Sequence, residues 1–199
     1  MANGARSCAK RRRVLRMKVL FVCTGNICRS PIAERVLRHL GEAEGVDLDV
    51  SSAGTRAING LEMHPESVRV LRSKGLDYHG FRSQMLTPEL AAQSDVVLGM
   101  TREHRAVARQ LAPSRWKRMY ALREIADIGT DGRVGKVTHE RRIAGPTDST
   151  LDIEDPMGKP GAVFDQVGEL IQQSMYGVIE WITQRQAEPS IMSGTEERQ

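Results

Sequence analysis

Short continuous apolar runs alternate along the chain with longer segments in which apolar residues recur at helical spacing. Val19–Val22 and Val96–Leu98 are uninterrupted apolar runs, which is typical of strands buried on both faces of a parallel sheet. The alternating segment 47–52 predicts another strand, and 118–122 is a candidate for a fourth. Strands that alternate with helices indicate a doubly wound α/β domain. We therefore predict a four-stranded parallel sheet with helices on both faces.

Capping residues and prolines mark where the helices begin. Ser30 is a good N-cap and Pro31 has a φ already set for a first helical turn, so a helix is predicted to open there, with Gly41 placed to end it. Residues 127–150 show no sustained period and predict an irregular connection. The other predicted helices are 65–74, one that begins at Thr87–Pro88, one from Thr101 to Leu111, and a long one over 163–182.

Composition and charge narrow the possible classes of protein. The chain has 199 residues, of which 40% are hydrophobic and 27% charged, as expected for one soluble globular domain. No apolar run approaches the ~20 residues that a membrane span needs. The net charge is +4, but residues 1–18 carry seven basic residues and no acid, which leaves −3 for the remainder. The basic charge belongs to a tail, so we expect neither a nucleic-acid partner nor a membrane partner.

The cysteines point to a reducing compartment. There are three, Cys8, Cys23 and Cys28, all near the N-terminus, whereas a disulfide framework would spread them along the chain. The apolar run before Cys23 is shorter than the roughly seven residues that a signal peptide requires. A metal site on the three thiols would lack a fourth ligand nearby. We therefore expect a cytoplasmic protein without a bound metal.

The residues with the clearest chemistry follow the first predicted strand. Cys23 ends that strand, and after a short loop Arg29 and Ser30 stand where the next helix begins. A helix N-terminus at the carboxyl edge of a parallel sheet favours phosphate, because its free N–H groups and its dipole are positive there. Gly25 and Asn26 can adopt left-handed backbone angles that turn successive N–H groups inward, and Arg29 adds a planar fork of donors. The segment therefore predicts a phosphate-binding loop.

A cysteine beneath such a loop is a candidate nucleophile. The loop N–H groups, the helix dipole and Arg29 should favour the thiolate of Cys23, which would be aimed at phosphorus. A free cysteine at a strand end is often only a small buried hydrophobe, but the spacing Cys-x5-Arg-Ser before a proline-opened helix outweighs that interpretation. The reaction also needs a general acid. Asp155 is the candidate, since Pro156 restricts it to extended geometry and stiffens its loop.

These segments resemble the low molecular weight protein tyrosine phosphatases over most of 17–183. The likeness begins with Val22–Glu34, which is close to the family signature over its whole length, and continues through 51–55 and 94–101. Ile153–Pro156 looks like the acid loop of the family. The resemblance implies hydrolysis of phosphotyrosine in proteins through a phosphocysteine intermediate, without a metal or cofactor.

The resemblance also implies roles for individual residues. Cys23 would attack phosphorus while Arg29 and the loop N–H groups bind the phosphate oxygens. Asp155 would protonate the leaving phenolate and then activate water. Ser30 would donate to the thiolate, and Asn26 would hold the loop conformation. The expected site residues are Cys23, Arg29 and Asp155 for catalysis, with Thr24, Gly25, Asn26, Ile27, Cys28 and Ser30 for phosphate binding and support.

The chain departs from the family pattern at two places. Met157 and Gly158 follow the acid-loop proline where the family often has aromatic residues, which puts stacking on a tyrosine ring in doubt. Phe81 stands where a histidine is usual, and an altered core contact is expected there. Cys28 looks like the second loop cysteine of the family, which can form a reversible disulfide with the nucleophile and so protect it from over-oxidation.

Three other functions share parts of this pattern. Protein arginine phosphatases of the same family carry Thr where this chain has Ile27, whose apolar bulk should favour an aryl phosphate. Arsenate reductases linked to thioredoxin pass the oxidation to downstream cysteines, and none follows Cys28. A non-catalytic phosphate-binding module would be expected to have lost Cys23, Arg29 or Asp155, and all three are present.

The expected organisation has three parts. Residues 1–16 would be a basic flexible extension, because Met17 looks like the usual start of the family. Residues 17–185 would form the phosphatase domain, and 186–199 a disordered tail. The expected partners are tyrosine-phosphorylated proteins, with the enzyme acting as a monomer or a weak homodimer.

Overall fold

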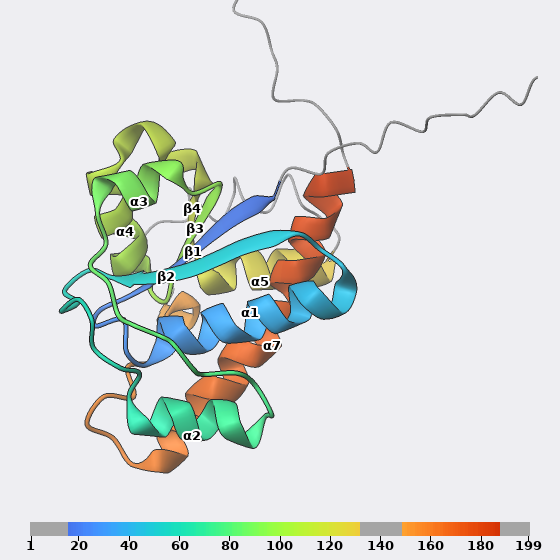
Figure 1. Ribbon diagram of the computed structural model, residues 1–199. Coiled ribbons are helices and arrows are strands. Elements are labelled where there is room, and N and C mark those ends of the chain that lie inside the picture. Colours follow the sequence, from blue (N-terminus) through green and yellow to red (C-terminus); the bar gives the residue numbers. More distant parts are fainter. Residues whose placement is uncertain (1–15, 132–148, 188–199) are drawn as a thin grey trace, which may run out of the picture.

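A four-stranded parallel sheet forms the centre of the molecule. The structure is a computed structural model that describes residues 16–131 and 149–187. The strands lie in the order β2-β1-β3-β4, and all neighbouring pairs are parallel (Figure 1). Their bounds are β1 Met17–Cys23, β2 Leu48–Gly54, β3 Val96–Gly99 and β4 Met119–Ala121. Each of the four predicted strands is present within two residues of its expected bounds.

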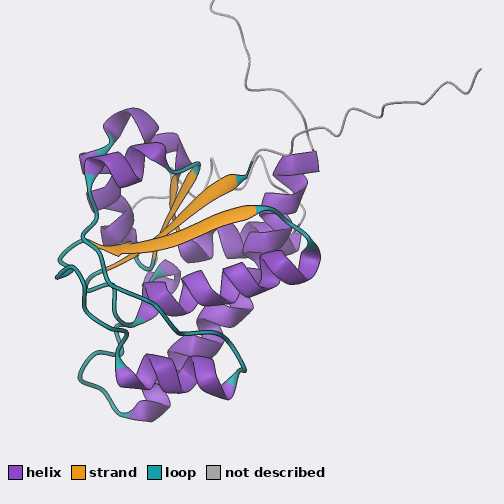
Figure 2. Ribbon diagram, viewed as in Figure 1, coloured by secondary structure: helices purple, strands orange, loops and turns teal. Residues whose placement is uncertain are grey.

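Helices cover both faces of this sheet, which confirms the predicted doubly wound α/β fold. Helices α1, α5 and α7 pack together against one face, and α3 and α4 lie on the other (Figure 2). Helix α2 packs on α1 and α7. The helices are α1 Arg29–Glu44, α2 Pro65–Ser73, α3 Pro88–Gln93, α4 Arg102–Leu111, α5 Leu122–Asp131 and α7 Gly161–Ala187, with short 3₁₀ turns at Pro113–Arg118 and Ser149–Leu151.

The continuous apolar runs of the strands reflect the two-sided burial of the sheet. Successive side chains of a strand point to opposite faces. Phe21 therefore belongs to the core under α1 and α7, whereas Leu20 and Val22 belong to a second core under α4. Phe81 is buried in the first core, as expected for the position where the family usually carries a histidine.

The structure corrects the predicted bounds of the first helix. The helix begins at Arg29, and Ser30 does not cap it, because its hydroxyl bonds to the side chains of Cys23 and Asn26 instead. Gly41 does not end the helix but is buried within it, and the helix continues to Glu44. Gly45 then ends it in the left-handed conformation, with a φ of 66°. The other predicted caps, Thr87 and Thr101, are confirmed.

Three expected segments differ from the structure or lie beyond it. The connection predicted over 127–150 is helical as far as Asp131, and 132–148 lies outside the described residues. Arg16 falls within the predicted N-terminal extension, yet its guanidinium donates to the backbone oxygen of Leu48 at 3.1 Å. Helix α7 continues to Ala187, past the expected start of the tail. Residues 1–15 and 188–199 lie outside the described ranges. Within 16–131 and 149–187, no helix is long and apolar enough to cross a membrane.

Strand β2 approaches the loop after β1 so closely that only glycine fits at Gly54. A Cβ added there would lie 2.5 Å from the backbone oxygen of Thr24 and 2.8 Å from the backbone nitrogen of Asn26. Both neighbours are backbone atoms that cannot swing away. The glycine therefore sets how closely the sheet supports this loop.

We expect Gly54→Ala to destabilise the fold by about 2 kcal/mol, because the methyl group must displace backbone. Gly41→Ala is the matched control. Its added Cβ would meet the flexible end of the Leu48 side chain at 2.9 Å, and alanine favours the helix, so the net change should stay within about 1 kcal/mol. Chemical denaturation of both variants measures the difference. Equal stability of the two would contradict the close-approach argument.

Candidate active site

The loop between β1 and α1 curls around the end of the first strand. Asn26 has a φ of 54°, and among the described residues other than glycine it alone has a positive φ. The left-handed conformation predicted for this loop is therefore confirmed at Asn26, whereas Gly25 does not adopt it. An asparagine tolerates this conformation because its short polar side chain can bond locally.

The sulfur of Cys23 accepts hydrogen bonds from inside this loop. The backbone N–H of Asn26 donates to Sγ of Cys23 at 3.2 Å, and Oγ of Ser30 lies 2.9 Å from the same sulfur. The side-chain amide of Asn26 also donates to Oγ of Ser30 at 3.0 Å. This leaves the Ser30 proton free to point at the sulfur. Two donors therefore stabilise a thiolate at Cys23.

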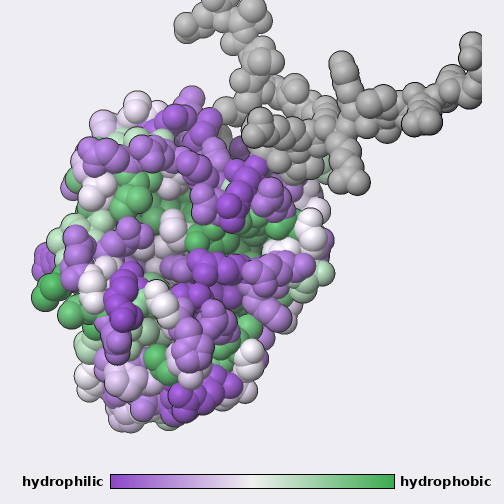
Figure 3. Space-filling view, viewed as in Figure 1, coloured by the Kyte–Doolittle hydropathy of each residue, from purple (hydrophilic) through white to green (hydrophobic). Residues whose placement is uncertain are grey.

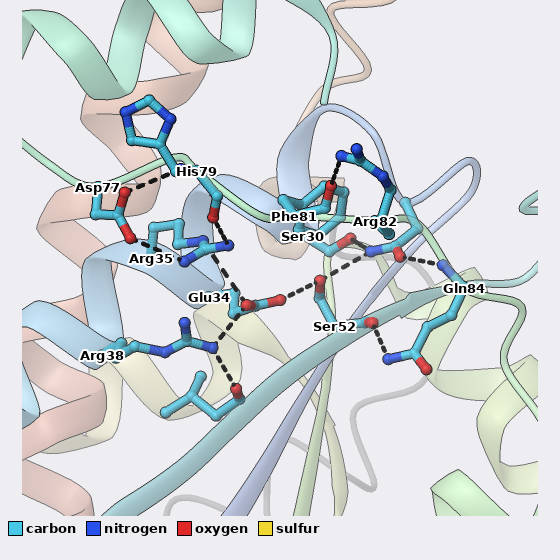
Figure 4. A network of polar contacts seen from close by, with 12 residues as sticks. Ser30, Glu34, Arg35, Arg38, Ser52, Asp77, His79, Phe81, Arg82 and Gln84 are labelled. Carbon is cyan, nitrogen blue, oxygen red and sulfur yellow. Dashed lines mark hydrogen bonds and ion pairs between the residues drawn. The ribbon is translucent and has the colours of Figure 1, made fainter. Parts of the chain in front are cut away.

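A buried carboxylate sets the direction of this network (Figure 4). Oγ of Ser52 donates to Oε2 of Glu34 at 2.7 Å, because a carboxylate can only accept. Ser52 is thereby left to accept from the amide of Asn26 at 2.8 Å. The backbone N–H of Gln84 donates to Oδ1 of Asn26 at 2.8 Å. Arg38 balances the charge of Glu34 with an ion pair of 2.8 Å.

Arg29 lies in the pocket with its guanidinium almost fully buried. Its Nη1 donates to the backbone oxygen of Ile153 at 3.0 Å, and its Nη2 bonds to a carboxylate oxygen of Asp155 and to Oγ1 of Thr24. Among the described residues, no group bonds to its Nε. A buried guanidinium N–H without a partner is costly in a folded protein.

Asp155 lies at the mouth of the pocket on a loop that is fixed at several points. The backbone N–H of Ile153 donates to the oxygen of Met100 at 2.9 Å, and Arg102 forms an ion pair of 2.8 Å with Asp152. The Asp155 side chain remains 46% exposed, and its Oδ1 accepts from the backbone N–H of Met157 at 3.2 Å. The carboxylate is thus held at the boundary between the buried guanidinium and solvent.

The loop and Asp155 enclose a small cavity. Its volume is about 150 Å³, and residues of both segments line it: Cys23, Thr24, Gly25, Ile27, Cys28, Arg29, Asp155 and Met157. The expected catalytic residues therefore meet in one pocket. Asn26 and Ser30 support the pocket from behind, where both are buried.

Cys28 is the second cysteine of the pocket. Burial, reinforced by the negative charges of Cys23 and Asp155, raises the pKa of the Cys28 thiol to about 12. Cys28 therefore stays protonated at any working pH. Both cysteines are free and buried. The reversible disulfide between them stays a prediction.

A buried histidine supports the loop from the side of α4. Nε2 of His104 lies 3.0 Å from Oγ1 of Thr24, and its Nδ1 lies 2.7 Å from Oγ1 of Thr101. Since Thr24 accepts from Arg29, its own proton is available for His104, which then carries its proton on Nδ1. Burial, together with the charge of Arg29, lowers the pKa of His104 to about 4. The ring is therefore neutral near pH 7.

Sequence reasoning missed the supporting residues Glu34, Ser52, Gln84 and His104. Glu34 and Ser52 lie inside the motifs that carry the resemblance, but nothing in their spacing shows that their side chains meet. His104 lies in a helix whose cap is visible in the sequence, yet its contact with Thr24 spans 80 positions. Only the pairing of β1 with β2 and β3 brings these side chains to one loop.

The geometry agrees with what the comparisons with known proteins find. A family model described as low molecular weight phosphotyrosine protein phosphatase matches residues 18–188. The chain belongs to this family. It is thus a hydrolase of the low molecular weight phosphatase class.

Relatives of this phosphatase include enzymes named for two substrates. Low molecular weight protein-tyrosine phosphatase A of Mycobacterium tuberculosis is 34% identical over 176 residues, which cover 86% of this chain and 94% of that protein. The protein-arginine-phosphatase of Bacillus subtilis is 32% identical over 162 residues, covering 79% and 93%. The YwlE arginine phosphatase of Geobacillus stearothermophilus superposes with a TM-score of 0.70 at 28% identity, covering 87% of this chain and 97% of that one.

The His104 pKa of this phosphatase predicts a pH dependence of its stability. In the unfolded chain His104 binds a proton below about pH 6.5, whereas in the folded chain it does so only below about pH 4. The stabilisation lost when the unfolded state takes up this proton is therefore complete above pH 6.5, and it is lost as the pH falls from 6.5 to 4. From about pH 6.5 to 4.5 the wild type should lose about 2 kcal/mol through this group. The side chain of His104→Gln cannot titrate, so over the same pH range the free energy of unfolding of this variant should fall by about 2 kcal/mol less than that of the wild type.

Denaturation midpoints at the two pH values measure the effect. His39, which is exposed on α1, provides the matched control, since His39→Gln should follow the wild type. The same loss of stability in wild type and His104→Gln would show that the buried ring does not titrate as argued.

Proposed function

We propose that this phosphatase hydrolyses phosphotyrosine in proteins by transferring the phosphoryl group to Cys23. The observation that carries the proposal is the arrangement around one cavity of three groups: a sulfur that accepts two hydrogen bonds, a buried guanidinium and a half-exposed carboxylate. Each corresponds to one requirement of phosphoryl transfer, namely a nucleophile, a stabiliser of negative charge and a proton donor.

In the first step, the Cys23 thiolate attacks phosphorus and an S–P bond forms. The P–O bond to the tyrosine oxygen breaks, and Asp155 in its acid form gives its proton to that oxygen. Arg29 and the N–H groups of the loop from Thr24 to Cys28 bind the three phosphoryl oxygens, where charge is spread in the transition state. The products are a neutral tyrosine, phosphocysteine and the Asp155 carboxylate.

In the second step, water replaces the thiolate. The Asp155 carboxylate takes a proton from the water, whose oxygen attacks phosphorus and forms a new P–O bond. The S–P bond breaks, Cys23 leaves as a thiolate, and inorganic phosphate is released. Ser30 and Asn26 stabilise the leaving thiolate as they do the attacking one. The cycle uses side chains of this chain alone, with no metal or cofactor.

Residues at the mouth of the pocket favour tyrosine over arginine as the phosphorylated residue. Ile27 and Met157 line the cavity with apolar surface. A phenyl ring gains from burial against such surface, whereas a guanidinium would lose hydration there without a fixed partner. Because arginine phosphatases are among the relatives, phosphoarginine is the alternative substrate. Initial rates on phosphotyrosine and phosphoarginine peptides of the same sequence compare the two directly.

The free cysteines of the pocket suit a reducing compartment. A thiolate nucleophile requires a reduced sulfur, and the cytoplasm keeps thiols reduced. We therefore place the enzyme in the cytoplasm, where it would meet phosphorylated proteins as a monomer or weak homodimer.

Hydrolysis of aryl phosphates by two variants tests the mechanism. Cys23→Ser should abolish turnover of para-nitrophenyl phosphate, because the weaker nucleophile cannot form the intermediate. Asp155→Ala should slow phenyl phosphate about a hundredfold, since its leaving phenolate needs the proton. The same variant should affect para-nitrophenyl phosphate far less, because that leaving group departs without help.

The two substrates separate catalysis from folding. Circular dichroism checks that Asp155→Ala is folded, and equal losses on the two substrates in the folded variant would remove Asp155 as the acid. Turnover that survives in Cys23→Ser would remove Cys23 as the nucleophile.

A further inference from the structure

The first turn of α4 contacts both loops that form the catalytic pocket. The backbone N–H of Arg102 donates to Oδ1 of Asp152 at 2.8 Å, and its guanidinium donates to both oxygens of that carboxylate, with Nη2 2.8 Å from Oδ2. Further along the same turn, Nε2 of His104 lies 3.0 Å from Oγ1 of Thr24 in the phosphate-binding loop. Asp152 begins the segment 152–157, which carries the proposed general acid and which we call the acid segment. One helical turn therefore joins both halves of the site.

The ion pair between Arg102 and Asp152 is more sheltered than a surface ion pair. Much of the face shown in Figure 3 is hydrophilic, as expected where charged side chains lie in water. The side chains of Arg102 and Asp152 are by contrast only 16% and 31% exposed. Burial disfavours the charge on Asp152, but the hydrogen bonds from Arg102 outweigh it and hold the pKa of this carboxyl below its usual value. The carboxylate therefore stays ionised and bound to Arg102 near neutral pH.

The contacts of the acid segment fix both its place and its direction. The backbone N–H of Ile153 donates to the oxygen of Met100 at 2.9 Å, and the backbone oxygen of Ile153 accepts from Arg29 at 3.0 Å. These bonds attach one residue and leave the chain able to turn about it. The side chain of Asp152, held on α4, adds a second point of attachment. Two neighbouring points define a direction, and this direction sets where the Asp155 carboxyl lies.

We propose that Arg102 is a positioning residue for the general acid, because its hold on Asp152 directs the carboxyl of Asp155 towards the leaving oxygen of the substrate. The proposal rests on the proposed function and adds a residue that is not among those lining the pocket. Arg102 therefore acts through Asp155 and not by touching the substrate. Proton transfer needs the donor within hydrogen-bond reach of the oxygen, and a misplacement of about 1 Å can cost about a hundredfold in rate.

Arg102→Met removes the guanidinium and keeps an unbranched apolar side chain. Its kcat on phenyl phosphate should fall about tenfold, since that leaving group needs the proton, whereas kcat on para-nitrophenyl phosphate should stay within about twofold of the wild type. Arg102→Lys keeps a charge for Asp152 without the planar fork, so it should recover part of the rate on phenyl phosphate. Equal slowing of both substrates by a folded Arg102→Met would indicate a merely structural role and overturn the proposal.

A double variant shows whether Arg102 acts through Asp155. Arg102→Met added to Asp155→Ala should slow phenyl phosphate by no more than about twofold beyond Asp155→Ala alone. A further tenfold loss would give Arg102 an independent contribution and overturn the proposal. Asp152→Asn approaches the pair from its other side, because it keeps an oxygen for the N–H of Arg102 and loses the charge. It should slow phenyl phosphate more than para-nitrophenyl phosphate, as Arg102→Met does.

Lys74→Met is the matched control for the loss of a cation. Lys74 joins α2 to α7 through an ion pair of 2.9 Å with Glu169 and is not among the residues that line the pocket. This variant should hydrolyse both substrates at rates within about twofold of the wild type. A difference between the two substrates as large as that in Arg102→Met would show that the effect follows from the loss of any ion pair, and the proposal would fall.

Hydrogen exchange separates this proposal from the proposed function. The backbone N–H groups of Ile153 and Met157 are hydrogen-bonded in the acid segment. Both should exchange at least about fivefold faster in Arg102→Met than in the wild type, because the segment opens more often. Unchanged exchange would overturn the proposal while leaving hydrolysis through Cys23 intact. Faster exchange combined with equal losses on both substrates in Asp155→Ala would show that the proposed function itself fails, and the role of Arg102 with it.

Discussion

The catalytic end of the molecule depends on the left-handed backbone of Asn26. A non-glycine residue in this conformation costs about 1 kcal/mol or more, so the surrounding structure must stabilise it. Four hydrogen bonds do so, and their partners lie in four parts of the fold: Cys23 at the end of β1, Ser30 in α1, Ser52 in β2 and the backbone of Gln84. One residue, through its backbone N–H and its side-chain amide, thereby joins β1, α1 and β2.

The electrostatics of the site follow from the direction of these bonds. Glu34 can only accept, so each hydroxyl and amide between it and Cys23 donates toward the carboxylate or toward the sulfur. Arg38 neutralises the carboxylate at a distance from the nucleophile. On the other side of the sulfur, Arg29 supplies positive charge where phosphate would lie. A thiolate is thus stabilised without an acid in contact with it.

The fold and the loop could be predicted because their signals are local. Each strand of the sheet appears as a short apolar run, and Cys23, Arg29 and Ser30 are close together in the chain. The errors lay where a tertiary contact overrides a local preference. Ser30 has the side chain of a helix cap but bonds to the sulfur instead, and Gly41 has the residue type of a helix end but is buried against Leu48. Contacts such as that between Thr24 and His104 depend on strand order and leave no local signal.

The central claim is that the phosphoryl group passes through the sulfur of Cys23. Acid quenching during turnover of an aryl phosphate, followed by mass spectrometry of the peptides, locates the intermediate directly. The account predicts a phosphoryl group on the peptide that contains Cys23, formed within the first turnover and lost when substrate is exhausted. A phosphoryl group on another residue, or full turnover with no phosphorylated intermediate in the quenched enzyme, would contradict it.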